Sequence, residues 1–116
     1  MTRFAVPVVS PEGLDSKVSE HFARSEYFAI LVADDDRVVS VDVVHCAPED
    51  DKKKAGLLAD GGVEVVLAGR IGSCMVRVFM DKGIPMFSGA GGTVEQAFKD
   101  YKAGKLAEVI PNPYQL

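Results

Sequence analysis

The chain has few cysteines and no long apolar run, and both absences restrict its class. Its two cysteines, Cys46 and Cys74, form no recognisable pair motif, whereas small secreted domains carry a denser framework of paired cysteines. No apolar stretch approaches the roughly 20 residues of a membrane-spanning helix. The first residues run directly into an apolar strand pattern, without the features of a signal peptide. These observations predict a reduced, cytoplasmic protein with no membrane partner.

A broad basic surface is also missing. The 17 acidic and 13 basic residues give a formal net charge of −4, which argues against nucleic acid as a partner. The composition is that of an ordinary globular protein, with 47% hydrophobic and 26% charged residues. A length of 116 residues is typical of one domain. We therefore predict a single domain over residues 1–116.

Hydrophobic periodicity predicts five strands and three helices. The short acidic turn at residues 34–36 indicates an antiparallel hairpin between the second and third strands, and Pro7 indicates an edge or an irregular point in the first strand. The order β-β-β-α-β-α-β-α predicts an α/β fold whose mixed sheet is parallel in one half. The predicted strands cover residues 4–9, 27–33, 37–45, 63–68 and 84–87, and the predicted helices cover about 52–60, 73–82 and 93–104.

A glycine-rich turn separates the last predicted strand from the last predicted helix. Glycines let a backbone approach a ligand, and the helix N-terminus that follows favours an anion. The turn lacks the lysine of a P-loop and the full dinucleotide fingerprint, so a tight turn that needs positive φ angles is the alternative explanation. The candidate anion-binding residues of this turn are Ser88, Gly89, Gly91, Gly92 and Thr93.

A second strand-to-helix turn contains Arg70, Gly72 and Ser73. Ligands of open α/β sheets bind beyond the carboxyl ends of the strands, so both turns would line one pocket if the strands before them are parallel neighbours. Cys74 would begin the intervening helix, where a thiol is a better metal ligand. The alternative for Cys74 is a small buried hydrophobic side chain.

The connector at residues 10–25 is long for so small a domain, and long loops are often functional. It contains His21, whose imidazole is a candidate metal ligand, with a merely solvated histidine as the alternative. The adjacent His45 and Cys46 would point to opposite faces of a strand, and the four-ligand spacing of a zinc site is absent. No nucleophile-elbow motif indicates a catalytic triad.

Three segments carry a resemblance to a known family. Residues 13–28 (GLDSKVSEHFARSEYF), 91–97 (GGTVEQA) and 101–106 (YKAGKL) resemble motifs of the dinitrogenase iron-molybdenum cofactor biosynthesis family, within a likeness that covers about residues 3–110. Ala23 stands where the family commonly has glycine. The resemblance implies a ribonuclease H-like three-layer fold, with a five-stranded mixed sheet and helices on both faces.

The resemblance also implies a function. Family members bind or carry the iron-molybdenum cofactor or its precursors, and a related small protein of sulfate reducers, the orange protein, holds a molybdenum–copper sulfide cluster. Members have used a histidine as a cluster ligand, for which His21 is the nearest candidate here. A ribonuclease H-type nuclease needs an acidic residue in its first strand, and residues 4–9 contain none.

We therefore expect a non-enzymatic carrier of an anionic metal–sulfur cluster, with the cluster or its protein donor or acceptor as partner. The expected site combines Arg70 and the 88–93 turn with two candidate metal ligands, His21 and Cys74. The alternative is a protein of another functional class, a regulatory protein–protein interaction module that binds no metal. The third hypothesis is an enzyme that acts on a phosphorylated metabolite. Only the glycine-rich turns support it, and it is the least favoured of the three.

Overall fold

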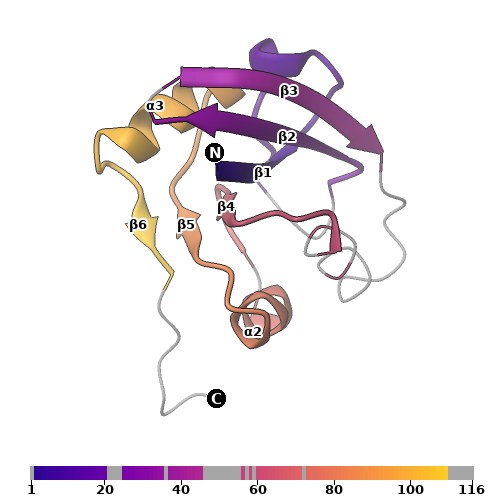
Figure 1. Cartoon of the computed structure of the whole chain (residues 1–116), viewed down its shortest axis with the longest axis vertical. Coiled ribbons are helices and arrows are strands. Elements are labelled where there is room, and N and C mark those ends of the chain that lie inside the picture. Colours follow the sequence, from indigo (N-terminus) through magenta and orange to yellow (C-terminus); the bar gives the residue numbers. More distant parts are fainter. Residues whose placement is uncertain are drawn as a thin grey trace.

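The computed structural model describes residues 2–20, 25–35, 37–45, 56, 58, 60–71 and 73–109. One mixed sheet has the strand order β3-β2-β1-β4-β5-β6 (Figure 1). The strands are β1 (Thr2–Val8), β2 (Tyr27–Asp34), β3 (Arg37–His45), β4 (Val65–Leu67), β5 (Met86–Ser88) and β6 (Ala107–Glu108). A short 3-10 helix, η1 (Gly13–Asp15), and the helices α2 (Ser73–Asp81) and α3 (Val94–Lys102) connect them.

The sheet confirms the predicted division into an antiparallel and a parallel half. β2 pairs with both β1 and β3 in antiparallel register, and Asp35 takes a positive φ of 54° in the tight turn of the hairpin. β1 pairs with β4 and β4 pairs with β5, both in parallel. The parallel strands β4 and β5 are joined by α2, as a crossover connection requires.

The prediction of five strands was wrong, because the chain reverses after α3 and adds a sixth. β6 pairs antiparallel with β5, with Phe87 opposite Glu108, and the Val109 N–H donates to the Met86 carbonyl over 2.8 Å. The reversal uses Gly104 at a φ of 75°. Both residues of β6 are exposed, so this strand has no apolar pattern by which the sequence could predict it.

Of the two alternatives predicted from Pro7, the edge strand was wrong, and an irregular point in the strand accords with the pairing. β1 lies inside the sheet, between β2 and β4. Its parallel pairing with β4 involves only Phe4 and Ala5, so Pro7 lies beyond the paired stretch, where its missing N–H costs no bond to β4. The Pro7 carbonyl instead accepts a hydrogen bond from the Ser19 N–H over 2.8 Å.

Helices cover both faces of the sheet, and the alternation of side chains along β1 explains why. Ala5 lies in the cluster packed by α2, which also contains Met75 and Phe79 of that helix. Phe4, Val6 and Val8 lie in the other cluster, which is packed by α3. That helix contributes Val94 and Phe98. Successive side chains of a strand point to opposite faces, so one apolar strand supplies both cores.

The helix predicted at about residues 52–60 is described in part. Gly56, Leu58 and Asp60 are helical, and the other residues of that range lie outside the described part of the chain. Leu58 is buried against the α2 face of the sheet. No helix in the described ranges is long and apolar enough to cross a membrane.

Candidate functional site

The site lies at the sheet edge where the parallel strands end. Because β1, β4 and β5 run in the same direction, their last residues, Val8, Leu67 and Ser88, lie toward one edge. Three connections leave from there: the long first loop, the turn that begins at Ala68, and the glycine-rich turn that begins at Gly89. Ligands of open α/β sheets bind at such an edge.

The first loop is anchored against the glycine-rich turn by backbone hydrogen bonds. The Val18 N–H donates to the Gly92 carbonyl over 2.8 Å, and the Val94 N–H donates to the Ser16 carbonyl over 2.9 Å. On the other side, the Val9 N–H donates to the Lys17 carbonyl over 3.0 Å. Residues 16–19 therefore run as an extended segment between the end of β1 and the start of α3, which fixes the loop at this edge.

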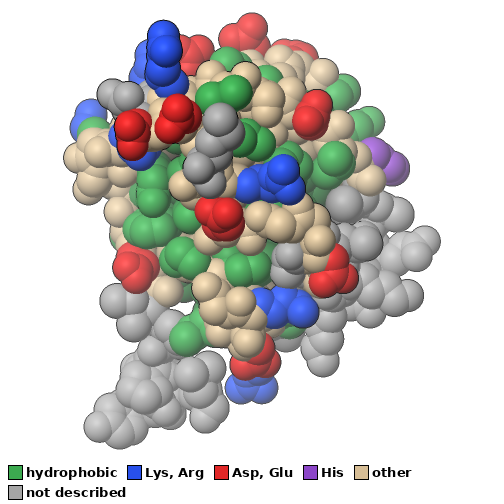
Figure 2. Space-filling view, in the orientation of Figure 1, with side chains coloured by type: hydrophobic (Ala, Val, Ile, Leu, Met, Phe, Trp, Pro, Cys, Tyr) green, Lys and Arg blue, Asp and Glu red, His purple; other side chains and the backbone are tan. Residues whose placement is uncertain are grey.

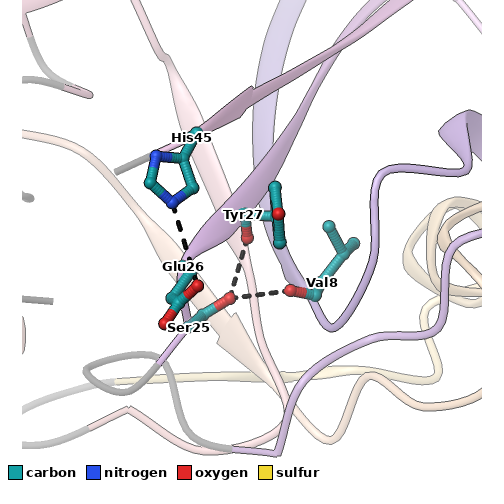
Figure 3. A network of polar contacts seen from close by, with 5 residues as sticks. All are labelled: Val8, Ser25, Glu26, Tyr27 and His45. Atoms are coloured by element: carbon teal, nitrogen blue, oxygen red, sulfur yellow. Dashed lines mark hydrogen bonds and ion pairs between the residues drawn. The ribbon is translucent and has the colours of Figure 1, made fainter. Parts of the chain in front are cut away.

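A buried serine fixes the point at which the first loop enters β2. The Ser25 hydroxyl is 2.9 Å from the Val8 carbonyl oxygen and 2.8 Å from the Tyr27 carbonyl oxygen, and it donates toward both (Figure 3). Beside it, His45 Nε2 lies 3.8 Å from Glu26 Oε2, with both side chains largely exposed. The serine ties the ends of β1 and β2 together, while the exposed pair adds little to stability.

A cavity of about 200 Å³ opens between the three connections. Glu20, Gly69, Arg70, Gly89 and Ala90 line it. Gly69 has a structural reason to be glycine, because a Cβ there would lie 3.3 Å from the Ala90 carbonyl oxygen and 3.4 Å from the Glu20 Cα. The absence of a side chain at Gly69 therefore allows the first loop and the glycine-rich turn to approach each other.

Some polar groups of this cavity form hydrogen bonds within the protein, and others are exposed to a ligand. The Gly89 N–H donates to the Gly69 carbonyl over 3.2 Å, and the Ala90 N–H donates to the Ala68 carbonyl over 3.0 Å. These two amides hold the turns together, so they are already hydrogen-bonded within the protein and do not face a ligand. Arg70 is exposed and is the only cation among the described lining residues, and Glu20 places a carboxylate in the same cavity.

Several predicted anion-binding residues of the glycine-rich turn have structural roles. Thr93 is the N-cap of α3, and its hydroxyl accepts from the Gln96 N–H over 3.2 Å. The Ser88 hydroxyl lies 3.5 Å from the Ala107 carbonyl, so it faces β6. Gly89 and Gly92 have φ angles of 90° and 70°, so the turn needs them for its geometry. Of these residues, only Gly89 lines the cavity, and Gly91 is exposed beside it.

The predicted metal ligands are not described by the structure. His21, Cys46 and Gly72 lie outside the described residues, and so do the side chains of Ser73 and Cys74 at the start of α2. Among the described residues, no three His, Cys, Asp or Glu side chains gather as they would around a metal ion. The placement of His21 and Cys74 as ligands stays a prediction.

Two of the five described lining residues, Glu20 and Gly69, were not predicted as site residues, whereas Ala90 lies within the predicted 88–93 turn. Each of the two is adjacent in the chain to a predicted residue: Glu20 precedes His21, and Gly69 precedes Arg70. Their position in the cavity follows from the approach of loops that are distant in sequence. Only a prediction of that approach would have identified them.

Comparison with known proteins identifies relatives over nearly the whole chain. The sequence model of the dinitrogenase iron-molybdenum cofactor family matches residues 3–104. A Thermotoga protein, provisionally assigned as NifB and placed in the DUF35 family, is 30% identical, with a TM-score of 0.78 over 97% of this chain and 99% of that protein. Among curated proteins, no sequence matches.

Two further solved structures share the fold. The apo form of the orange protein from Desulfovibrio gigas is 25% identical, with a TM-score of 0.82 over 97% of each chain. A Methanocaldococcus jannaschii protein provisionally described as a dinitrogenase is 22% identical, with a TM-score of 0.72 over 95% of this chain and 96% of that one. These likenesses define the class as small α/β domains with one mixed sheet. The family match extends over most of its length, so the chain belongs to the dinitrogenase iron-molybdenum cofactor family.

Proposed function

We propose that this protein binds and carries an anionic metal–sulfur cluster, of the iron-molybdenum precursor or molybdenum–copper sulfide type, at the cavity between its three loops. The observation that carries the proposal is the exposed Arg70 in a cavity formed by the two strand-to-helix turns. Membership of the dinitrogenase iron-molybdenum cofactor family supports this cargo. We treat residues 1–116 as one domain with the three-layer, ribonuclease H-like layout, because both core clusters share the single sheet.

The described residues of the cavity match one property of such a cluster, its negative charge. The guanidinium of Arg70 would attract the negative charge that metal–sulfur clusters carry. The Glu20 carboxylate in the same cavity repels an anionic cargo, so Glu20 and Arg70 act in opposite directions on cluster binding. Soft ligation would come from Cys74 at the start of α2 or from His21, the residue after Glu20 in the chain.

We propose that this cavity binds its cargo without catalysing a reaction. Its described lining contains one carboxylate and one guanidinium, with no serine or threonine nucleophile and no second carboxylate. Arg70 stays protonated, so Glu20 is the one described side chain of the lining that could exchange a proton with reacting atoms. Binding and release of a preformed cargo are the functions that such a lining supports, together with a donor or acceptor protein.

An absorption titration of the purified apo-protein with tetrathiomolybdate and copper tests this function. We expect a stoichiometric visible charge-transfer band, and Arg70→Gln should weaken binding by up to about fivefold, the range of an exposed charge interaction. Arg37→Gln is the matched control, because Arg37 is exposed at the opposite end of the sheet, where Asp34 pairs with it in the hairpin register. His21→Ala and Cys74→Ala identify the ligand.

A flat spectrum from a correctly folded protein would overturn the cluster-carrier role. That result, together with specific capture of a protein partner, would favour the metal-free regulatory module. Equal weakening by the Arg70 and Arg37 substitutions would place cluster binding elsewhere on the molecule.

A further inference from the structure

A second, larger cavity lies over the antiparallel half of the sheet. Its volume is about 560 Å³, and none of its described lining residues also lines the cavity at the parallel edge. The floor consists of residues from β1, β2 and β3, and the wall of Leu58, Gly61 and Val63. Ligand sites for small molecules commonly have volumes of about 300–1,000 Å³, with apolar linings and a few polar groups.

The strand register defines the floor of this cavity. Arg3, Val32 and Ser40 lie opposite one another across β1, β2 and β3. In the next row on the same face, Ile30 pairs with Asp42, since residues two apart in a strand share a face. The floor is therefore apolar along β2, with a charged residue on each flanking strand.

The two charged residues lie at opposite corners of this floor. Arg3 and Asp42 are two strands and one row apart, so their Cα atoms are separated by roughly 12 Å. Within the described part of the chain, neither residue takes part in an ion pair. Arg3 Nη1 donates to the Gly61 carbonyl over 2.7 Å, which orients the guanidinium at the wall and leaves its other donors available.

The apolar surface between these charges is continuous. Ile30 and Val32 of β2 are partly exposed, and Val44, which is 38% exposed, extends the apolar lining beyond Asp42 on β3. Leu58 and Val63 face them from the wall and are buried. An occupant that covers this apolar strip and presents an anion to Arg3 and a cation to Asp42 would complement both exposed charges.

We propose that this cavity binds a linear, apolar small molecule with a carboxylate at one end and an ammonium group at the other. The carboxylate pairs with Arg3, whose planar guanidinium matches carboxylate geometry. The ammonium group pairs with Asp42, and the methylene chain covers Ile30 and Val32. This site is independent of the cluster cavity, so it stands or fails separately from the proposed function.

Isothermal titration of the full chain with three probes of matched length tests the proposal. The probes are 8-aminooctanoate, which carries both charges, octanoate, which lacks the ammonium group, and octylammonium, which lacks the carboxylate. We expect 8-aminooctanoate to bind about twofold to fivefold more tightly than either comparator, because each exposed charge pair contributes a factor of this size at most. Amide chemical shifts of β2 and β3 should move on binding.

Substitutions assign each end of the ligand. Asp42→Asn should remove the advantage of 8-aminooctanoate over octanoate, and Arg3→Gln should remove its advantage over octylammonium. Arg3→Lys retains a cation but lacks the planar guanidinium, so it should bind more tightly than Arg3→Gln and less tightly than the unchanged protein. Asp34→Asn is the control, since Asp34 is exposed on β2 outside the lining.

Three results would overturn the proposal. Equal affinity for all three probes would show that the charges play no part, and an unchanged preference in Asp42→Asn would refute its pairing role. Concentration-dependent dimerisation that shifts the same β2 and β3 resonances, without probe binding, would assign the surface to a second copy of the chain.

Discussion

Replacement of Gly69 by alanine tests whether close approach of two loops builds the cluster cavity. An alanine Cβ would lie 3.3 Å from the Ala90 carbonyl oxygen, 3.4 Å from the Glu20 Cα and 3.5 Å from the Ser19 carbonyl oxygen. All three are backbone atoms, so no side chain can rotate away. The loops must instead separate by a few tenths of an ångström.

The expected cost follows from the nature of these contacts. Overpacking by a methyl group costs about 1–3 kcal/mol in well-packed interiors, and the lower end applies here because the contacts lie at the margin of an open cavity. We expect Gly69→Ala to lower the free energy of unfolding by about 1 kcal/mol. A domain of this size would then lose about 4 °C in melting temperature.

Gly91→Ala is the matched control, because it adds the same methyl group in the glycine-rich turn where no atom lies within 4 Å. Its effect should stay within about 0.5 kcal/mol. Urea unfolding followed by circular dichroism gives both stabilities, and the absorption titration gives cluster binding, which Gly69→Ala should weaken more than Gly91→Ala does. Equal stability and equal binding of the two variants would refute the role of Gly69 as a close-approach position.

Three further substitutions test the cavity and its support. Glu20→Gln should strengthen cluster binding by roughly threefold, because it removes a like charge from the cavity; Glu64→Gln, at an exposed position outside the lining, should not change the titration. Thr93→Ala should cost about 1 kcal/mol in urea unfolding through loss of the α3 cap, while Thr93→Ser, which keeps the hydroxyl, should retain most of it. Phe98→Ala should lower the free energy of unfolding by about 3–5 kcal/mol, because Phe98 is buried and its ring packs edge-to-face on Phe4, with the ring centroids 5.5 Å apart. A decrease of less than about 1 kcal/mol in urea unfolding would contradict that packing.

Figure 2 shows acidic and basic side chains interspersed on one face of the molecule. The interspersion accords with the acidic overall balance of the sequence, since no basic surface dominates this view. Charge composition alone could not locate Arg70 or Arg3 within a cavity. Their roles depend on which neighbours the sheet brings beside them.

The sequence by itself determined the alternation of strands and helices and the division of the sheet. The apolar run that became β1, the acidic turn after β2 and the Thr93–Gln96 cap are local signals, readable because each depends on residues close in the chain. The family also followed from the sequence, because its motifs span most of the chain. Local patterns carry this information because helix and strand periodicities are properties of neighbouring residues.

The sequence predicted a shared pocket of the two strand-to-helix turns on the condition that β4 and β5 are parallel neighbours, which they are, but only the tertiary structure brought Glu20 of the first loop into that cavity. Glu20 and Gly89 line one cavity although they are far apart in sequence, because parallel pairing of β4 and β5 and the contacts of Gly69 bring their loops together. The exposed strand β6 and the interior position of Pro7 depend likewise on pairing between distant segments. Such pairing is decided by the packing of the whole sheet, and no local pattern encodes it.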